Sequence, residues 1–255
     1  MAKSEASSPV KTAGRVFDVI ETLDDLDRGT LTEVAARLDV PRSTAYDHLT
    51  SMVDAGILVK EDKEYRLSLR FFQYGMHARE NVGVSTYVTP KLEQLAEETG
   101  EITWYVVEEN GKGVYLEKAE GSHAVQPYGK LGEHVHLHDI AAGKAILAQL
   151  PDTRVQEIID RHGLPARTER TITSADALFE ELAAIRERGV AFNDGEAMNR
   201  FRAVASPVVT DGTLHGSIVI SGPENRLRGD RFRTELPERV AGTANAIELE
   251  ILSAE

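Results

Sequence analysis

The side chains best suited to bind another molecule follow Pro41 in a short polar run. Arginine, serine, threonine and tyrosine can donate hydrogen bonds to phosphate oxygens or to the edges of bases in a duplex. An aspartate in the same run can accept a hydrogen bond from the amino group of cytosine. The candidate residues of this run are Arg42, Ser43, Thr44, Tyr46 and Asp47.

A second polar group flanks this run in the sequence. Thr32 precedes it, and Lys60, Lys63 and Arg66 follow it. Lysine and arginine neutralise phosphates wherever they lie on a duplex, whereas side chains on base edges give sequence preference. A fold that brings both groups to one surface would have the chemistry to bind double-stranded DNA.

The apolar residues around these groups predict three helices. Residues 16–23 show helical spacing, and Thr30 with Glu33 forms a capping-box pattern at the start of the next helix. Pro41 suits the first turn of a third helix, because an N–H at that position has no partner within the helix. Gly56 then ends this helix, since glycine readily adopts the left-handed backbone of a helix terminus.

Two short apolar runs follow, at 57–59 and 65–69, around a charged turn at 60–64, and they predict a hairpin. Three helices and a hairpin are the order of a winged helix-turn-helix domain. In that fold the N-terminal residues of the third helix enter the major groove, while the hairpin reaches the backbone. We therefore interpret residues 9–69 as a DNA-binding domain with its DNA-reading unit at 30–50. A small helical domain that packs against protein is the alternative.

The charge balance argues against a DNA-binding protein. The 255 residues include 42 acidic and 29 basic side chains, for a net charge of −13, whereas a DNA-binding protein normally carries a basic surface. Most of the basic residues are arginine. We interpret this acidic, lysine-poor composition as an adaptation to a high-salt cytoplasm. Phosphate contacts release fewer counterions in high salt, so DNA binding would depend more on shape and base contacts.

Several classes of protein are not favoured by the sequence. It contains no cysteine, which excludes disulfides, thiolate metal sites and cysteine nucleophiles. Its start lacks the apolar core of a signal peptide, and no segment approaches the roughly 18 apolar residues of a membrane span, so we expect a cytoplasmic protein without a membrane role. We also find no nucleophile elbow, phosphate loop or zinc-protease motif, and we expect no catalytic residues and no cofactor. Asp194 and Glu196 are the nearest approach to an acid/base pair.

The second half of the chain predicts a mixed domain. Residues 70–82 carry aromatic side chains among charges, which favours a linker helix that packs against a partner. The Asn110-Gly111 pair predicts a tight hairpin, and Asp211-Gly212 predicts another turn near the end of the chain. Further helices are expected at about 141–150, 153–162 and 174–188, followed by strands near 190–193, 202–209 and 214–221 and a closing helix at 241–251.

Three histidines alternate in this half and raise the question of a metal site. A strand would place His134, His136 and His138 on one face with Asp139 adjacent, as a divalent metal site requires. Structural histidines are the alternative, and the residues alone leave both open.

The sequence resembles the IclR family of bacterial and archaeal regulators along nearly its whole length. The resemblance begins in LTEVAARLDVPRSTAYDHLTSMVDAGILVKEDKEYRLSLRF, continues in YGKLGEHVHLHDIAAGKAILAQL and LAAIRERGVAFNDGEAMNRFRAVASPVV, and ends in IVISGPENRL. It implies an α+β fold, with an N-terminal winged helix-turn-helix and a C-terminal GAF-like mixed α/β domain. That domain, with its linker helix, would span residues 70–255 and bind a small-molecule effector. His138 matches a histidine that is usually structural in the family, so we expect no metal.

The sequence departs from the family pattern at both sites. Asp47 replaces an arginine that is usual in the recognition helix, and His48 replaces an aliphatic residue. Family members that bind small carboxylates use an acid, a cysteine and two serines near positions 193, 203, 219 and 221, and here only Ser221 keeps its polar side chain. Backbone amides at the start of the helix at 141 could still hold an anion or a hydroxyl group. The predicted effector-binding residues are Ala141, Ala142, Gly143, Asn193, Ala203 and Ser221.

Taken together, these patterns predict a homodimer or tetramer that binds double-stranded promoter DNA and responds to a small-molecule effector. Two other classes remain open. A metabolite-binding enzyme that carries a DNA-binding-like module would turn over a small acid or sugar derivative. An interaction protein would use its acidic surface to bind a basic partner without contacting DNA.

Overall fold

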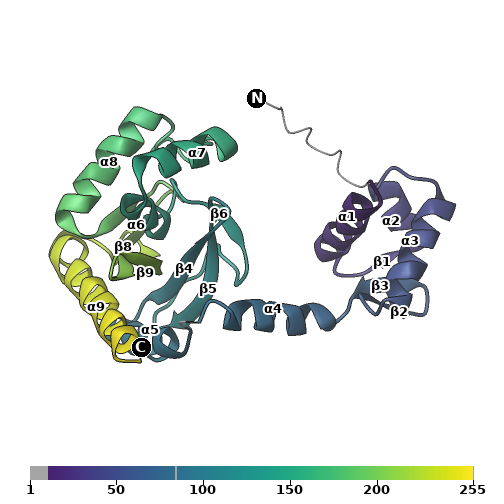
Figure 1. The fold of residues 1–255 in the computed structure, drawn as a ribbon, viewed down its shortest axis with the longest axis horizontal. Coiled ribbons are helices and arrows are strands. Elements are labelled where there is room, and N and C mark those ends of the chain that lie inside the picture. The colour runs from purple at the N-terminus through teal and green to yellow at the C-terminus, as the bar shows by residue number, and fades with distance from the viewer. Residues whose placement is uncertain (1–10, 84, 255) are drawn as a thin grey trace. The chain divides into compact units, whose positions relative to one another are not determined.

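The computed structural model describes residues 11–83 and 85–254, which form two compact units divided between Ala78 and Arg79 (Figure 1). The first unit is small and contains three helices, three short strands and most of a fourth helix. Its elements are α1 (Lys11–Leu26), β1 (Gly29–Thr30), α2 (Leu31–Arg37), α3 (Arg42–Asp54), β2 (Leu58–Glu61), β3 (Glu64–Leu67) and α4 (Arg70–Glu80).

Local interactions explain where the helices of the first unit begin and end. The Thr30 hydroxyl accepts from the backbone N–H of Glu33, and the Glu33 carboxylate accepts from the backbone N–H of Thr30 at 2.8 Å, which confirms the predicted capping box. The hydrogen bonds that the Glu33 carboxylate accepts from the backbone N–H and the hydroxyl of Thr30 lower its pKa. Gly56 has a φ of 71° directly after α3, as a helix-ending glycine should.

The wing hairpin is tighter than its sequence predicts. Strands β2 and β3 pair antiparallel as far as Glu61 and Glu64, so the turn contains only Asp62 and Lys63. Asp62 adopts a φ of 56°, a left-handed conformation that aspartate tolerates better than most residues. The predicted five-residue turn was therefore wrong in length, because the charged residues at its ends extend the two strands.

The second unit is a six-stranded antiparallel sheet with helices on both faces (Figure 1). The strand order is β6-β5-β4-β9-β8-β7. The strands are β4 (Ile102–Glu109), β5 (Lys112–Glu120), β6 (His134–His136), β7 (Ala191–Asp194), β8 (Phe201–Thr210) and β9 (Thr213–Pro223). The helical segments are α5 (Ser85–Thr99), α6 (Ala141–Gln149), α7 (Asp152–His162), α8 (Ala175–Arg188), the π-helical turn η1 (Arg231–Glu235) and α9 (Leu236–Ala254).

Alternating strand residues divide the core of this unit between the two faces of the sheet. Trp104 and Val106 belong to the cluster that includes α6, α7 and α8, whereas Tyr105 and Val107 belong to the cluster that includes α5 and α9. Both predicted glycine turns are confirmed, since each consists of two residues with positive φ between paired strands. Among the described residues, no helix is long and apolar enough to cross a membrane.

Candidate functional sites

The first candidate site is a concave surface between the start of α2, the start of α3 and the wing. Its lining includes five of the nine side chains that the sequence assigns to DNA: Thr32, Arg42, Tyr46, Lys60 and Lys63. The fold therefore brings part of the predicted base-reading group and two of the three predicted wing cations to one surface. The remaining lining residues are Thr30, Leu31, Asp62 and Tyr65.

Helix α3 is oriented by its apolar face. Ala45, Leu49 and Met52 are buried against the rest of the unit, which turns the opposite face toward solvent. Tyr46 is 49% exposed on that open face. Ser43 and Asp47 are also exposed, and Thr44 is half-buried, but these three do not line the concave surface.

Arg66 is held by an acidic neighbour in the wing. Its Nε donates to Glu61 at 3.0 Å, and the other oxygen of the same carboxylate accepts from Arg28 at 2.7 Å. These two hydrogen bonds, the one from Arg66 foremost, lower the pKa of Glu61. The geometry makes Arg66 a brace for the wing, whereas Lys60 extends over the Tyr65 ring at 5.3 Å. No sequence pattern singles out Arg28, because its partner lies on a distant strand.

The second candidate site is a cavity of about 20 Å³ between the sheet and the start of α6. Strand pairing brings its polar and apolar walls together, because Ser221 on β9 lies between Ile102 on β4 and Ala203 on β8. The irregular segment 125–128 forms another wall. The remaining lining residues are Trp104, Tyr115, Ile140, Ala141, Ala142, Asn193, Phe201 and Val219.

Aromatic side chains dominate this cavity, and none of its lining residues is charged. Trp104 and Tyr115 stack with ring centroids 4.8 Å apart, and Tyr128 meets Phe201 edge-on at 5.7 Å. Burial raises the pKa of Tyr128 to about 12 and that of Tyr115 still further, so both phenols stay neutral. Such a cavity favours a flat, largely apolar ligand.

Five of the six residues predicted to bind the effector line the cavity, and Gly143 does not. A Cβ atom at Gly143 would lie 2.2 Å from the carbonyl oxygen of Leu137, so this glycine permits close backbone packing. Asn193 lines the cavity, but its amide joins two other segments. Its Nδ2 donates to the carbonyl of Asp139 at 2.6 Å, and its Oδ1 accepts from the N–H of Glu196 at 3.1 Å.

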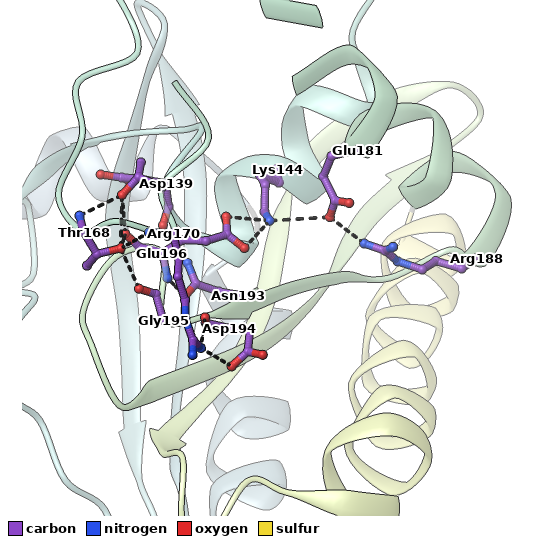
Figure 2. A network of polar contacts seen from close by, with 11 residues as sticks. Asp139, Lys144, Thr168, Arg170, Glu181, Arg188, Asn193, Asp194, Gly195 and Glu196 are labelled. Atoms are coloured by element: carbon purple, nitrogen blue, oxygen red, sulfur yellow. Dashed lines mark hydrogen bonds and ion pairs between the residues drawn. The ribbon is translucent and has the colours of Figure 1, made fainter. Parts of the chain in front are cut away.

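A buried ion-pair network surrounds Lys144 (Figure 2), and the N–H of Glu196 links it to the cavity-lining Asn193. Lys144 on α6 is 1% exposed, and its Nζ lies 2.7 Å from the carboxylate of Glu196 and 3.4 Å from that of Glu181. Glu181 also receives a hydrogen bond from Arg188 at 2.7 Å. Burial nevertheless raises the pKa of Glu196, because desolvation outweighs the attraction of Lys144. The network joins α6 to α8 and to the loop after β7.

Asp139 is the least compensated charged group near the cavity. It is fully buried, and neither carboxylate oxygen accepts a hydrogen bond from any described residue. The guanidinium of Arg167 approaches to only 3.8 Å, and the same group lies over the ring of Tyr128. Burial raises the pKa of Asp139 to about 6.

The three alternating histidines have separate surroundings. His134 is exposed and faces Glu109 at 3.2 Å, whereas His138 is buried and its Nε2 lies 3.1 Å from the carbonyl of Pro165. Only His134 and His136 belong to β6, and His136 contacts the Nζ of Lys112 at 2.9 Å. Burial, followed by the charge of Lys112, lowers the pKa of His136 to about 4. The part of the chain that the structure describes contains no cluster of three or more groups placed to hold a metal ion.

Comparison with known proteins places both units in one family. Residues 12–62 match the IclR helix-turn-helix domain, and residues 76–249 match the family described as bacterial transcriptional regulator IclR C-terminal. The probable HTH-type transcriptional regulator ArcR of Halobacterium salinarum is 29% identical, with 94% of each chain covered. The acetate operon repressor of Salmonella typhimurium is 30% identical over 86% of this chain and 81% of its own length.

Solved structures share the same fold. A putative transcriptional regulator from Rhodococcus sp. RHA1 has a TM-score of 0.82 and 24% identity, with 96% of this chain and 100% of its own chain covered. An IclR homolog from Microbacterium hydrocarbonoxydans, crystallised with 4-hydroxybenzoate, has a TM-score of 0.80 and 23% identity, with coverage of 95% and 99%. The expected α+β fold class and the resemblance to the family are thereby confirmed. The relatives named here are transcriptional regulators and not enzymes. The chain belongs to the IclR family of DNA-binding transcriptional regulators, with an N-terminal helix-turn-helix domain and a C-terminal effector-binding domain.

Proposed function

We propose that the chain regulates catabolic genes by binding a palindromic promoter site as a homodimer or a dimer of dimers, without catalysing a reaction itself. The observation that carries the proposal is the concave surface that unites Arg42, Tyr46, Lys60 and Lys63. Exposed side chains at the start of α3 would read base edges, while the wing lysines would neutralise phosphates.

Gel-shift titration of the operator tests this assignment. The operator itself can be obtained by incubating the full chain with sheared genomic DNA at high salt and sequencing the bound fragments. Arg42→Ala and Thr44→Ala are expected to weaken operator binding, because each removes a hydrogen-bond donor from the recognition helix. Unchanged binding by both variants would disprove the assignment. Arg37→Ala, at the exposed far end of α2, is the matched control.

The linker helix α4 provides the proposed dimer contact. None of its described side chains is buried, and Phe72 and Tyr74 are 69% and 51% exposed. Leu69, directly before the helix, is 83% exposed. Leu69 and Phe72 are three residues apart, a helical spacing that places side chains on one side, and exposed apolar side chains favour association. Phe72→Arg is expected to shift the chain toward monomer in analytical ultracentrifugation, and an unchanged sedimentation coefficient would place the dimer contact elsewhere.

For the effector, we propose an aromatic compound with a polar group directed at the start of α6. The aromatic walls provide the apolar contacts, and the first backbone N–H groups of α6, together with Ser221, provide hydrogen-bond donors. The compound crystallised with the Microbacterium relative, 4-hydroxybenzoate, has this chemistry. A compound of that size requires displacement of segment 125–128, since about 20 Å³ holds only one or two water molecules.

Fluorescence can test the effector pocket directly, because Trp104 is the single tryptophan of the sequence and lines the cavity. Titration with 4-hydroxybenzoate and related hydroxylated aromatics is expected to change the Trp104 emission. The same compound should alter operator affinity, since an effector acts only through its different affinities for the two DNA-binding arrangements. Binding without any change of Trp104 emission would place the effector site elsewhere. Turnover of the compound would instead favour the enzyme alternative.

A further inference from the structure

A basic hollow of about 540 Å³ lies at the edge of the effector domain, where β8 begins and β9 ends. Three of its six lining residues are arginine and one is glutamate, in a chain whose net charge is −13. Its size is within the range of small-ligand sites. The lining residues are Arg200, Arg202, Pro223, Glu224, Asn225 and Arg228, and none of them lines the aromatic cavity.

Arg202 is the least exposed arginine of this hollow, and its contacts hold it in place. Its Nη1 donates to the carbonyl of Leu227 at 2.9 Å, its Nη2 lies 3.2 Å from Glu224, and its Nε donates to Asp194. The guanidinium also lies over the ring of Phe232 at 4.9 Å. These contacts leave the side chain only 17% exposed and pair it with both Asp194 and Glu224, and Asp194 has a second guanidinium partner in Arg170. A ligand would therefore meet a positioned guanidinium and no unpaired carboxylate.

Arg200 and Arg228 provide two exposed cations in the lining. Both are exposed, and neither forms an ion pair with an acidic residue of the described chain. Arg200 has a φ of 61°, the left-handed conformation that glycine adopts without strain. Its carbonyl accepts from the N–H of Glu224 at 2.9 Å, which fixes the backbone in this place. An arginine at a position that favours glycine is a strained residue, and such residues gather at functional sites.

We propose that this hollow, the arginine hollow, binds a small phosphate-bearing anion at a second ligand site. Guanidinium groups match phosphate geometry with paired N–H donors, and such charge-assisted hydrogen bonds are stronger than neutral ones. Arg202 would provide the fixed contact, and the exposed Arg200 and Arg228 would add two further guanidinium groups. The site takes a multivalent anion, whereas the aromatic cavity has no charged side chain in its lining.

Isothermal titration of the full chain with inorganic pyrophosphate tests the proposal, with ionic strength held constant by exchange against KCl. We expect one pyrophosphate per chain, and about tenfold weaker binding for Arg228→Gln and for Arg200→Gly. Arg200→Gly relieves the left-handed strain, so its melting temperature is expected to equal or exceed that of the wild type. Arg161→Gln, which removes an exposed cation from α7, is the matched control and should bind pyrophosphate as the wild type does.

Three results would overturn the proposal. The first is the absence of pyrophosphate binding by the wild type, and the second is equal binding by all four proteins. The third is weaker operator binding by Arg228→Gln while its affinity for pyrophosphate equals that of the wild type. That result would make the hollow a contact for the DNA backbone. Lost pyrophosphate binding with unchanged operator affinity supports the second site and leaves the proposed regulatory function untouched.

Discussion

The starts of α3 and α6 both lack a side-chain cap, but their surroundings differ. Pro41 and Ile140 precede these helices, and neither side chain caps the first turn. Thr30 and Ser174, by contrast, cap α2 and α8 with side-chain oxygens. Both uncapped starts border a proposed binding surface, where their free N–H groups remain available for a ligand.

The difference between the two starts is what surrounds their N–H groups. At α3 the neighbouring side chains are polar and exposed, so sequence-specific contacts can come from the side chains themselves. At α6 the first three residues are Ala141, Ala142 and Gly143, all buried, so only the backbone can contribute polar contacts. An open surface thus achieves specificity with side chains, whereas an enclosed one relies on shape and backbone donors.

The largest expected effect comes from Gly143→Ala, which adds one carbon atom at the buried start of α6. In Gly143→Ala the new Cβ would lie 2.2 Å from the Leu137 carbonyl oxygen and 2.5 Å from its Cα, and backbone atoms cannot move aside easily. We expect the effector domain to lose about 3 kcal/mol or more of unfolding free energy in urea titration. Gly242→Ala in α9 is the control, because nothing lies within 4 Å of its Cβ, and it should be neutral or stabilising. Equal stability of the two variants would contradict the close packing of α6.

An aspartate lies shortly before each of the two helices, and the pair sharpens the comparison. Asp39 lies two residues before Pro41, and Asp139 lies directly before Ile140. Asp39 is exposed, whereas Asp139 is buried and its pKa is raised from 3.8 to about 6. The folded chain therefore retains this proton at pH values where the unfolded chain has lost it. The contribution to stability is present below pH 3.8 and is lost as the pH rises to 6.

Asp139→Asn is expected to remove this pH dependence. Its stability relative to the wild type should increase by about 3 kcal/mol between pH 3.8 and pH 6 and stay constant above that range. Urea titrations across that interval measure the difference. Asp39→Asn, at the exposed start of α3, is the matched control. A parallel pH profile for wild type and Asp139→Asn would show that Asp139 ionises normally.

A substitution at the exposed start of α3 should change operator binding and leave the unfolding free energy nearly unchanged. Arg42→Ala removes an exposed guanidinium from the first turn, so we expect about 30-fold weaker operator binding, or about 2 kcal/mol, in a gel shift. Its unfolding free energy should stay within about 0.5 kcal/mol of the wild type. Weaker binding accompanied by a large loss of stability would mean that α3 depends on Arg42 for its fold.

The same contrast explains what the sequence could predict. Local patterns determine the capping box at Thr30, the start of α3 after Pro41 and its end at Gly56, and the structure confirms each one. The two glycine turns are equally local, and they were predicted correctly. Among the predicted turns only the wing turn was misjudged, because the exposed charged residues Lys60, Glu61 and Glu64 continue the two strands.

The features of the candidate sites that the sequence did not predict all depend on residues far apart in the chain. Lys144 and Glu196 are separated by 52 positions, and Arg28 and Glu61 by 33. No periodicity relates such pairs, so the sequence did not predict the buried network or the brace on the wing. The burial of Asp139 was missed for the same reason, since it depends on segments that close over the residue only in the folded domain.

The smallest expected effect concerns the wing, whose lysines we propose as phosphate contacts beside the open start of α3. Lys60 lines the concave surface, and its Nζ lies over the ring of Tyr65. Lys60→Ala should weaken binding to all duplexes about equally and reduce the slope of log affinity against log salt concentration by about 1, because one phosphate contact is lost. Arg66→Ala should change the salt slope less, since Glu61 already holds that guanidinium. Operator titrations over a series of KCl concentrations distinguish the two variants, and a larger slope change for Arg66→Ala would make Arg66 the phosphate contact.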